Sequence, residues 1–206
     1  MIASTELDQL QTLIRSRRSV RRFLPKSVPT ELIIQIIETA IWSPSAHNRQ
    51  PWRFIVLQTD EKKKQFVDRM GDLFLQDLLA DGIPELEADQ AVQKTRGRVM
   101  TAPVAILLSL DTAMCDIYPD HRRSSAEHIM GVQSVAMAGN TLLLAAHAAG
   151  LGGVWLCAPL FVPELATTML NLPVDWEPQG LILLGYPASI PDARSRHNVE
   201  EVIRFI

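Results

Sequence analysis

Apolar residues at helical spacing predict two helices in the first quarter of the chain. Leu7, Leu10 and Ile14 recur every three or four residues, which predicts a helix from Thr5 into an arginine-rich segment. A second helix is expected to start near Thr30 and to end before Pro44, because apolar residues between 32 and 41 share one wide face. Residues 62–79 are also expected to be helical, whereas residues 81–90, with their Gly, Pro and acidic side chains, are expected to form a loop.

Short apolar runs predict buried strands, and one long apolar stretch predicts a core helix. The expected strands are "WRFIVLQ" (52–58), "PVAILLSL" (103–110), part of "GGVWLCAP" (152–159) and "QGLILLGYP" (179–187). Residues 125–149 predict a long helix that Gly150 ends, and residues 163–170 predict a short one. Strands without polar alternation are typical of a sheet covered on both faces. Helices and strands do not alternate strictly, so the expected fold class is α+β.

Composition is typical of one soluble domain spanning residues 1–206. Apolar residues make up 47% and charged residues 21% of the 206, and the net charge of −3 disfavours a nucleic-acid binder. Two cysteines exclude a disulfide framework. The first ten residues lack a signal-peptide pattern, and the apolar stretch 129–149 carries Gln133, Ser134, Asn140 and His147. We therefore expect a cytoplasmic protein with no membrane span.

The segment "RSRRSVRRF" (15–23) contains five arginines in nine residues. Guanidinium groups bind phosphate oxygens in a bidentate manner, and the Ser19 hydroxyl adds a further donor. "RSR" (194–196) repeats this pairing of cations and hydroxyl. A phosphate site and a solvated helix end both stay open on these residues alone.

Two further segments are candidates for ligand binding. In "SPSAHNRQPWRF" (43–54), Asn48 and Gln50 offer amide groups to a heterocycle, although a plain connection explains the segment equally well. In "GLGGVWLCAP" (150–159), three glycines let the backbone approach a flat ligand, although a helix cap and tight turn also fit. His121 and His128 lack an obvious third ligand, so the sequence predicts no metal site.

Together, in this order and with "LILLGYP" and "RSRHNVEEVI", these segments resemble the FMN-dependent nitroreductase family over about residues 10–204. The resemblance implies a three-layer α-β-α sandwich with a mainly antiparallel sheet. It also implies an intertwined homodimer, with the long core helix at the dimer interface and two FMN sites there.

The resemblance implies a role for each matching residue. Phosphate and ribityl contacts fall to Arg17, Arg18 and Ser19, closed over by Arg194 and Arg196. Arg21 lies beside the flavin pyrimidine edge and acts electrostatically. The other subunit contributes Pro44, Ser45, Ala46, Asn48 and Gln50. The backbone of Trp155, Leu156 and Cys157 passes the flavin ring near N5, and Cys157 stands where classical members carry an acidic residue.

The implied activity is ping-pong hydride transfer. NAD(P)H reduces FMN at N5 and leaves, and a nitroaromatic, quinone, enone or deazaflavin-type precursor is then reduced, without a catalytic side chain. The stretch "YPDHRRSSAEHIMGVQSVAMAGNTLLLAAHAAGLGGVW" (118–155) resembles the nitroreductase-like domain linked to biosynthesis of the deazaflavin coenzyme. The alternative is a flavin- or deazaflavin-binding module that serves a partner enzyme with little turnover of its own.

Overall fold

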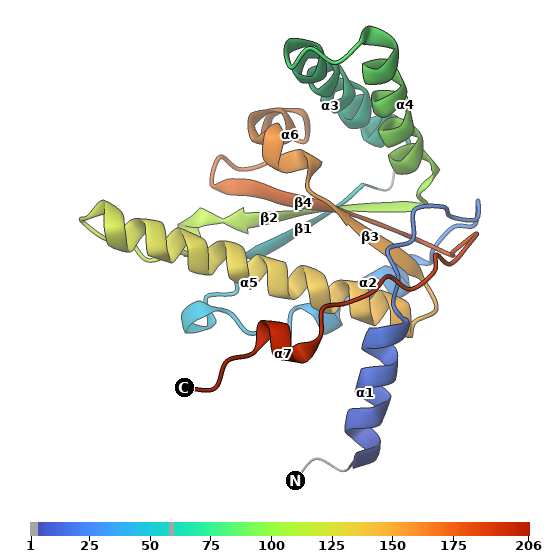
Figure 1. Ribbon diagram of the computed structural model, residues 1–206. Coiled ribbons are helices and arrows are strands. Elements are labelled where there is room, and N and C mark those ends of the chain that lie inside the picture. The colour runs from blue at the N-terminus through green and yellow to red at the C-terminus, as the bar shows by residue number, and fades with distance from the viewer. Residues whose placement is uncertain (1–3, 58–59) are drawn as a thin grey trace.

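The computed structural model describes residues 4–57 and 60–206, and Figure 1 shows a central sheet between two layers of helices. The strands within these residues are β1 (Trp52–Leu57), β2 (Val104–Asp111), β3 (Gly152–Leu156) and β4 (Trp176–Gly185). Their order is β1-β2-β4-β3, and each neighbouring pair is antiparallel. The predicted α+β class and antiparallel sheet are confirmed, while Gln58, the expected end of the first strand, lies outside the described residues.

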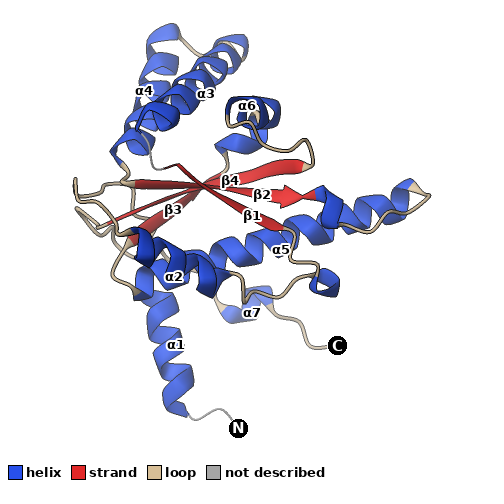
Figure 2. Ribbon diagram, turned by 180° about the vertical axis from the view of Figure 1, so that it is seen from behind, coloured by secondary structure: helices blue, strands red, loops and turns tan. Residues whose placement is uncertain are grey.

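Helices cover both faces of the sheet, as a three-layer sandwich requires (Figure 2). One layer contains α2 (Thr30–Ala40) and α5 (His121–Ala148), and the other contains α3 (Asp60–Ala80), α4 (Glu85–Thr101) and α6 (Pro163–Met169). Short 3₁₀ turns occur at η1 (Ala46–Asn48), η2 (Thr112–Met114) and η3 (Ala158–Phe161). In both ribbon views, α1 (Ser4–Ser16) projects away from the sheet, and α7 (Val199–Val202) lies beneath α5.

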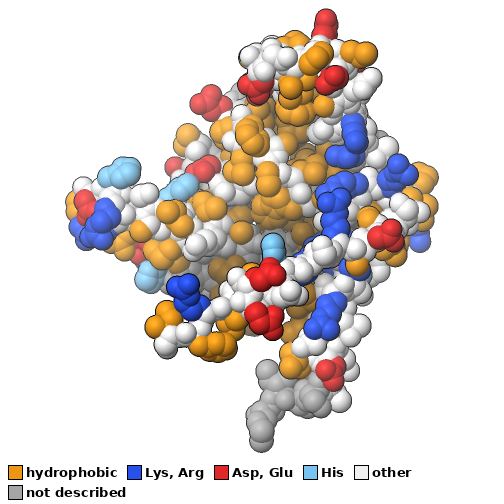
Figure 3. Space-filling view, viewed as in Figure 1, with side chains coloured by type: hydrophobic (Ala, Val, Ile, Leu, Met, Phe, Trp, Pro, Cys, Tyr) orange, Lys and Arg blue, Asp and Glu red, His pale blue; other side chains and the backbone are white. Residues whose placement is uncertain are grey.

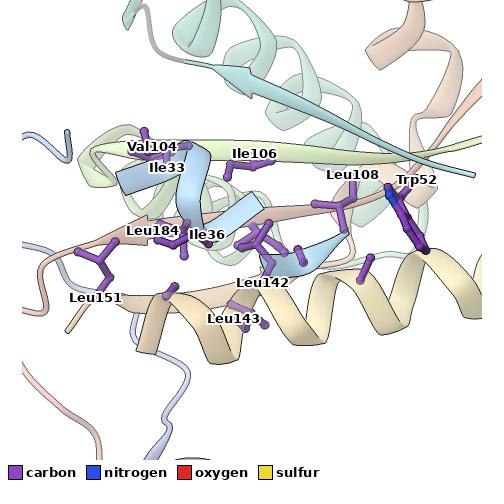
Figure 4. Close-up of a cluster of buried hydrophobic side chains, with 14 of the residues drawn as sticks. Ile33, Ile36, Trp52, Val104, Ile106, Leu108, Leu142, Leu143, Leu151 and Leu184 are labelled. Atoms are coloured by element: carbon purple, nitrogen blue, oxygen red, sulfur yellow. The ribbon is translucent and has the colours of Figure 1, made fainter. Parts of the chain in front are cut away.

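The apolar central strands contribute side chains to two hydrophobic cores, because alternate residues of a strand point to opposite faces of the sheet. Ile106 and Leu108 of β2 pack toward α2 and α5, where Figure 4 shows them near Ile36 and Leu142. Ala105 and Leu107 belong to the second core, on the side of α3 and α6. Every residue of β2 is buried, so the prediction of a sheet covered on both faces holds for this strand.

Helix α5 is the predicted core helix. Its length and composition alone would allow it to cross a membrane, but Leu142, Leu143 and Val135 are buried against the sheet of its own chain. It begins at His121, four residues earlier than predicted, because the Asp120 side chain accepts a hydrogen bond from the backbone N–H of Arg123 at 3.0 Å.

The predicted loop at residues 81–90 is wrong beyond residue 84, because α4 begins at Glu85. Pro84 occupies the N-cap position. Glu85 and Glu87 lie in the first turn, where acidic side chains stabilise a helix by their interaction with its dipole. Ala88 and Val92 are fully buried at helical spacing, and α4 packs along α3. The Gly and Pro residues were turn signals only for residues 81–84.

Substitutions at two helical glycines in different environments test the packing around Trp155. A Cβ on Gly139 of α5 would lie 2.1 Å from Cζ3 of Trp155, whereas a Cβ on Gly97 of α4 would meet no atom within 4 Å. We expect Gly139→Ala to lower the free energy of unfolding by about 1–3 kcal/mol through overpacking. Gly97→Ala should raise it by up to about 1 kcal/mol through helix propensity. Chemical denaturation measures both, and equal shifts would contradict the assigned packing of Trp155.

Candidate functional site

The arginine segment runs along the free edge of β3. The backbone N–H of Val20 donates to the carbonyl oxygen of Gly153 at 3.1 Å, and Ser19 forms an isolated parallel bridge with Gly153. Val20 is buried in the core on the α3 side, whereas Ser19 is half-buried and Arg21 is exposed. Two candidate ligand-binding segments are therefore adjacent in the fold.

Positive charge accumulates here without negative partners. Burial lowers the pKa of Arg17, and the nearby charges of Arg196 and Arg18 lower it further. Within the described chain, no carboxylate forms an ion pair with Arg17, Arg18, Arg21, Arg194 or Arg196. A group of cations that repel one another and have no counterion fits an anionic ligand such as a phosphate.

The C-terminal tail contributes to this cluster from far along the chain. The backbone N–H of Ala188 donates to the carbonyl oxygen of Arg22 at 3.0 Å, which ties the start of the tail to the arginine segment. Arg196 donates to the backbone oxygens of Arg194 and Ser195 at 3.2 and 3.1 Å. The fold therefore brings the charge of Arg196 close enough to act on Arg17. Arg194 is exposed on the same tail.

His147, near the end of α5, reports on the same cluster. Its Nε2 lies 2.8 Å from the Ser16 hydroxyl oxygen, which joins the ends of α1 and α5. Burial lowers the pKa of His147, and the charges of Arg17 and Arg18 lower it further. Its titration is therefore a probe of any anion that neutralises the arginines.

A cavity of about 690 Å³ opens at the C-terminal end of β3. Trp155, Leu156 and Cys157 contribute to its wall, opposite the apolar side chains of Met70 and Phe74 on α3. Figure 3 shows this face of the molecule, with basic side chains gathered beside a hollow that hydrophobic side chains surround. The volume is in the range that small-molecule ligands occupy.

The segment 43–51 lies in a different part of the chain. Its turn is held by hydrogen bonds from the backbone N–H of Gln50 to the Ser45 hydroxyl at 3.0 Å and of Ala46 to the Ser134 hydroxyl of α5 at 3.3 Å. His47, Asn48 and Gln50 have φ of 52°, 54° and 51°, in the left-handed region that non-glycine residues rarely adopt. Pro44, Asn48 and Gln50 are exposed.

One chain does not bring segment 43–51 to the arginines. The segment precedes β1, which is separated from β3 by two intervening strands, so three strand spacings place the two edges about 14 Å apart. Along the strands, β1 starts opposite Leu110, which pairs with Glu177, whereas Gly153 pairs with Leu184. Glu177 to Leu184 spans about 23 Å, so the two groups lie at opposite corners of the sheet. This separation is what the expectation of a second subunit requires.

Sequence reasoning missed two groups of residues. Val92 and Arg96 of the cavity wall lie on α4, the helix that was expected to begin as a loop. His47 was passed over within its segment, although it lies close to Asp116 and Glu127. Acidic residues after Pro84 were the available signal for α4, whereas no sequence pattern connects His47 to the two carboxylates.

The comparisons with known proteins all indicate the same family. The model of the nitroreductase family matches residues 14–186. A protein of Methanothermobacter thermautotrophicus, provisionally named NADH dehydrogenase/NAD(P)H nitroreductase, is 32% identical over 96% of this chain and 87% of its own length. The 5,6-dimethylbenzimidazole synthase of Rhodospirillum rubrum is 27% identical over 96% of this chain and 88% of its own.

Solved structures share the fold. A provisionally named nitroreductase of Desulfovibrio desulfuricans, crystallised with FMN, is 27% identical, with a TM-score of 0.70 over 94% of each chain. A BluB-like flavoprotein of Clostridium difficile has a TM-score of 0.78 at 23% identity, over 96% of this chain and 98% of its own. The second similarity concerns the fold alone.

Inorganic phosphate is expected to raise the pKa of His147 in the ligand-free protein. Phosphate that binds Arg17 and Arg18 removes the repulsion that disfavours the protonated imidazole, so the pKa moves back toward its ordinary value of 6.5. Titration of the His147 ring by NMR, with and without phosphate, measures the shift.

Arg17→Ala is the control, because it should raise the pKa of His147 by itself and reduce the response to phosphate. The lowered pKa also means that the folded chain binds fewer protons here than the unfolded chain. Stability present above pH 6.5 is therefore lost as the pH falls below that value and through the lowered pKa of the folded state. An unchanged or lowered pKa with phosphate would contradict the assigned anion site.

Proposed function

The chain belongs to the nitroreductase family, and on that premise we propose that it is a homodimeric, FMN-dependent NAD(P)H oxidoreductase. The observation that carries this proposal is the cluster of unpaired arginines beside Gly153, followed along the chain by the cavity wall at residues 155–157. The four residue steps from Gly153 to Cys157 span about 13 Å. The site therefore suits an elongated ligand with a phosphate at one end and a flat ring at the other.

The residues present fit FMN. Arg17, Arg18 and Ser19 bind its phosphate and ribityl chain, with Arg196 closing over the phosphate. The backbone of residues 155–157 lies against the ring. When bound, FMN supplies a centre that accepts hydride from NAD(P)H and passes it to an acceptor. Arg21, exposed beside the buried Val20, holds a fixed positive charge at the flavin edge where negative charge develops.

The cavity is the proposed place for the acceptor. Its wall is largely apolar, with Met70, Phe74 and Phe161 among the lining side chains. Such a wall excludes water and favours flat, electron-poor molecules. The proposed acceptors are a nitroaromatic, a quinone, an enone or a deazaflavin-type precursor, and neither a general acid nor a general base is assigned.

Several features of the single chain support a homodimer. Its accessible surface is 13079 Å², whereas a compact monomer of 23.0 kDa exposes about 9,600 Å². The excess of about 3,500 Å² per chain is large enough to supply one partner's share of an obligate dimer interface. Large apolar side chains are exposed on α1, on α5 and on the tail, namely Leu7, Leu10, Ile14, Ile129, Met137, Val202, Ile203 and Phe205. A second copy of the chain is the proposed cover for these elements, with α5 at the interface.

The dimer also accounts for segment 43–51. In the proposal, Pro44, Ser45, Ala46, Asn48 and Gln50 of one subunit complete the FMN site of the other. Support comes from the separation of this segment from the arginines within one chain and from its exposed amide side chains.

A cytoplasmic location is part of the proposal. Cys115 and Cys157 are both free thiols, as is usual in reducing compartments. Helix α5, although apolar and long, packs against the sheet and contributes buried side chains to the core.

The first test is anaerobic reduction. The protein should purify yellow, or become so with added FMN, and NADH or NADPH should bleach the flavin absorbance within seconds. A nitroaromatic added afterwards should restore the colour. A colourless protein that cannot be reconstituted would contradict the proposal. Bound flavin that neither donor bleaches would favour a binding module that serves a partner enzyme.

A second test asks whether two subunits build each site. One variant carries Arg17→Ala and Arg196→Ala, and the other carries Asn48→Gly and Gln50→Gly, because glycine removes the side chain without strain at positive φ. Each homodimer should lose most of its flavin. A mixed dimer retains one complete site, so co-expression should restore about one flavin per dimer, as measured by absorbance of the isolated heterodimer.

The matched control removes two other arginines of the same segment. Arg15→Ala with Arg22→Ala should keep its flavin, since neither is assigned a contact. Mixed dimers that bind no more flavin than their parents would exclude a site shared between subunits.

A further inference from the structure

Three potential metal ligands meet beside the start of α5, outside the arginine cluster and the cavity. They are His47 of η1, Asp116 after η2 and Glu127 in the second turn of α5. One ligand atom of each lies within 4.8 Å of the other two. These residues come from three separate segments of the chain.

Glu127 is the unusual member of this group. It is only 3% exposed, and its Oε1 accepts a hydrogen bond from the backbone N–H of Asp116 at 3.2 Å. Its Oε2 is enclosed and has no hydrogen-bond partner among the described residues. Arg49, the basic residue of this region, pairs with the Asp116 carboxylate instead. Burial of a carboxylate oxygen without a hydrogen-bond donor or a cation costs free energy, so this oxygen is a candidate to bind a cation.

His47 is held close to this carboxylate by the segment around it. The backbone N–H groups of Asn48 and Arg49 donate to Ser45 and Ala46 at 3.0 Å, and Ala46 donates to Ser134 of α5. The imidazole of His47 has no hydrogen-bond partner among the described residues. The backbone of His47 lies in the left-handed region, with a φ of 52°. An exposed imidazole is thus placed over an enclosed carboxylate.

We propose that His47, Asp116 and Glu127 bind a divalent transition-metal ion, with Zn²⁺ as the best match. One imidazole nitrogen with two carboxylate oxygens is a donor set that suits Zn²⁺, whereas Mg²⁺ and Ca²⁺ favour oxygen alone. Three protein ligands leave at least one position for water or another small ligand. The cation compensates the Glu127 carboxylate, while Arg49 continues to pair with one oxygen of Asp116.

The geometry needs only a small adjustment. Zn²⁺ with bonds of about 2.0–2.1 Å places tetrahedral ligand atoms about 3.3 Å apart, so no separation within the 4.8 Å limit has to close by more than about 1.5 Å. Rotation of the exposed His47 ring and of the half-buried Asp116 side chain supplies such a change, while Glu127 stays fixed in the helix.

A bound ion would join segment 43–51 to α5. The site uses residues of one chain, so it does not depend on FMN binding or on the proposed oxidoreductase activity. An unsubstituted protein that binds flavin but no metal ion would refute this inference alone, and one that binds the metal ion but cannot be loaded with flavin would refute only the proposed function.

The test is competition for Zn²⁺ between the chelator-treated full-length protein and a chromophoric chelator. We expect one high-affinity ion per chain, and Co²⁺ as a probe should give a visible absorption band. His47→Gly removes the imidazole and suits the left-handed backbone, and Glu127→Gln removes the charge. Each should weaken Zn²⁺ binding at least tenfold.

The matched control is His128→Gln, next to Glu127 on α5, whose ring lies 2.8 Å from a carboxylate oxygen of Glu177. It removes a histidine from a neighbouring His–carboxylate pair and should leave the affinity unchanged. Unchanged binding in His47→Gly and Glu127→Gln, or an equal loss in His128→Gln, would overturn the proposal. If Glu127→Gln misfolds by circular dichroism, His47→Gly still decides the outcome.

Discussion

Charge that finds no partner within the chain is the constraint on which the functional architecture depends. At the edge of β3, the repulsion among Arg17, Arg18 and Arg196 extends to His147 at the end of α5. Such an arrangement costs free energy in the isolated protein. The hydrogen bond from Val20 to Gly153 nevertheless holds the arginine segment against the sheet. In the proposed site, a phosphate would offset this repulsion, which is consistent with a locally basic cluster in a chain of net charge −3.

The sheet also decides how the two ends of the site relate to each other. The arginines lie beside the first half of β3, and the cavity opens at its last residues. Trp155 packs between Gly139 of α5 and Gly180 of β4, where any added Cβ would collide with the indole, so the two glycines allow β3 to pack closely against α5. A rigid strand between the anion site and the apolar cavity holds a fixed distance between them, which is what orientation of a bound cofactor requires.

The described chain leaves much of its apolar surface on the elements that project from the sandwich. Helix α1 and the tail after β4 contribute little to either core, yet both carry large exposed apolar side chains. Segment 43–51 also has unusual features, because it contains three left-handed residues and exposed amide side chains that have no hydrogen-bond partner among the described residues. Strain of this kind persists where the surrounding structure and a ligand or second subunit jointly determine it.

Local patterns were sufficient for most of the fold. The continuous apolar runs at residues 103–110 and 179–187 predicted buried strands, and the spacing in residues 125–149 predicted the core helix, because periodicity follows directly from burial. The same reasoning failed at α4, where Gly and Pro at 82 and 84 signalled a turn but not the helix that begins directly after it. Local signals describe a turn well and say little about what packs beyond it.

For the site, the sequence by itself determined the chemical groups, while the tertiary structure decided which of them meet. Arginines, serine and glycines were visible as segments, and the resemblance to a family gave them roles. The interaction of Arg17 with Arg196, the separation of segment 43–51 from both, and the approach of His47 to Asp116 and Glu127 follow only from the strand order and the helix packing. The physical reason is that electrostatic and coordination chemistry depend on distances through space, and residues far apart in sequence acquire those distances only when the sheet forms.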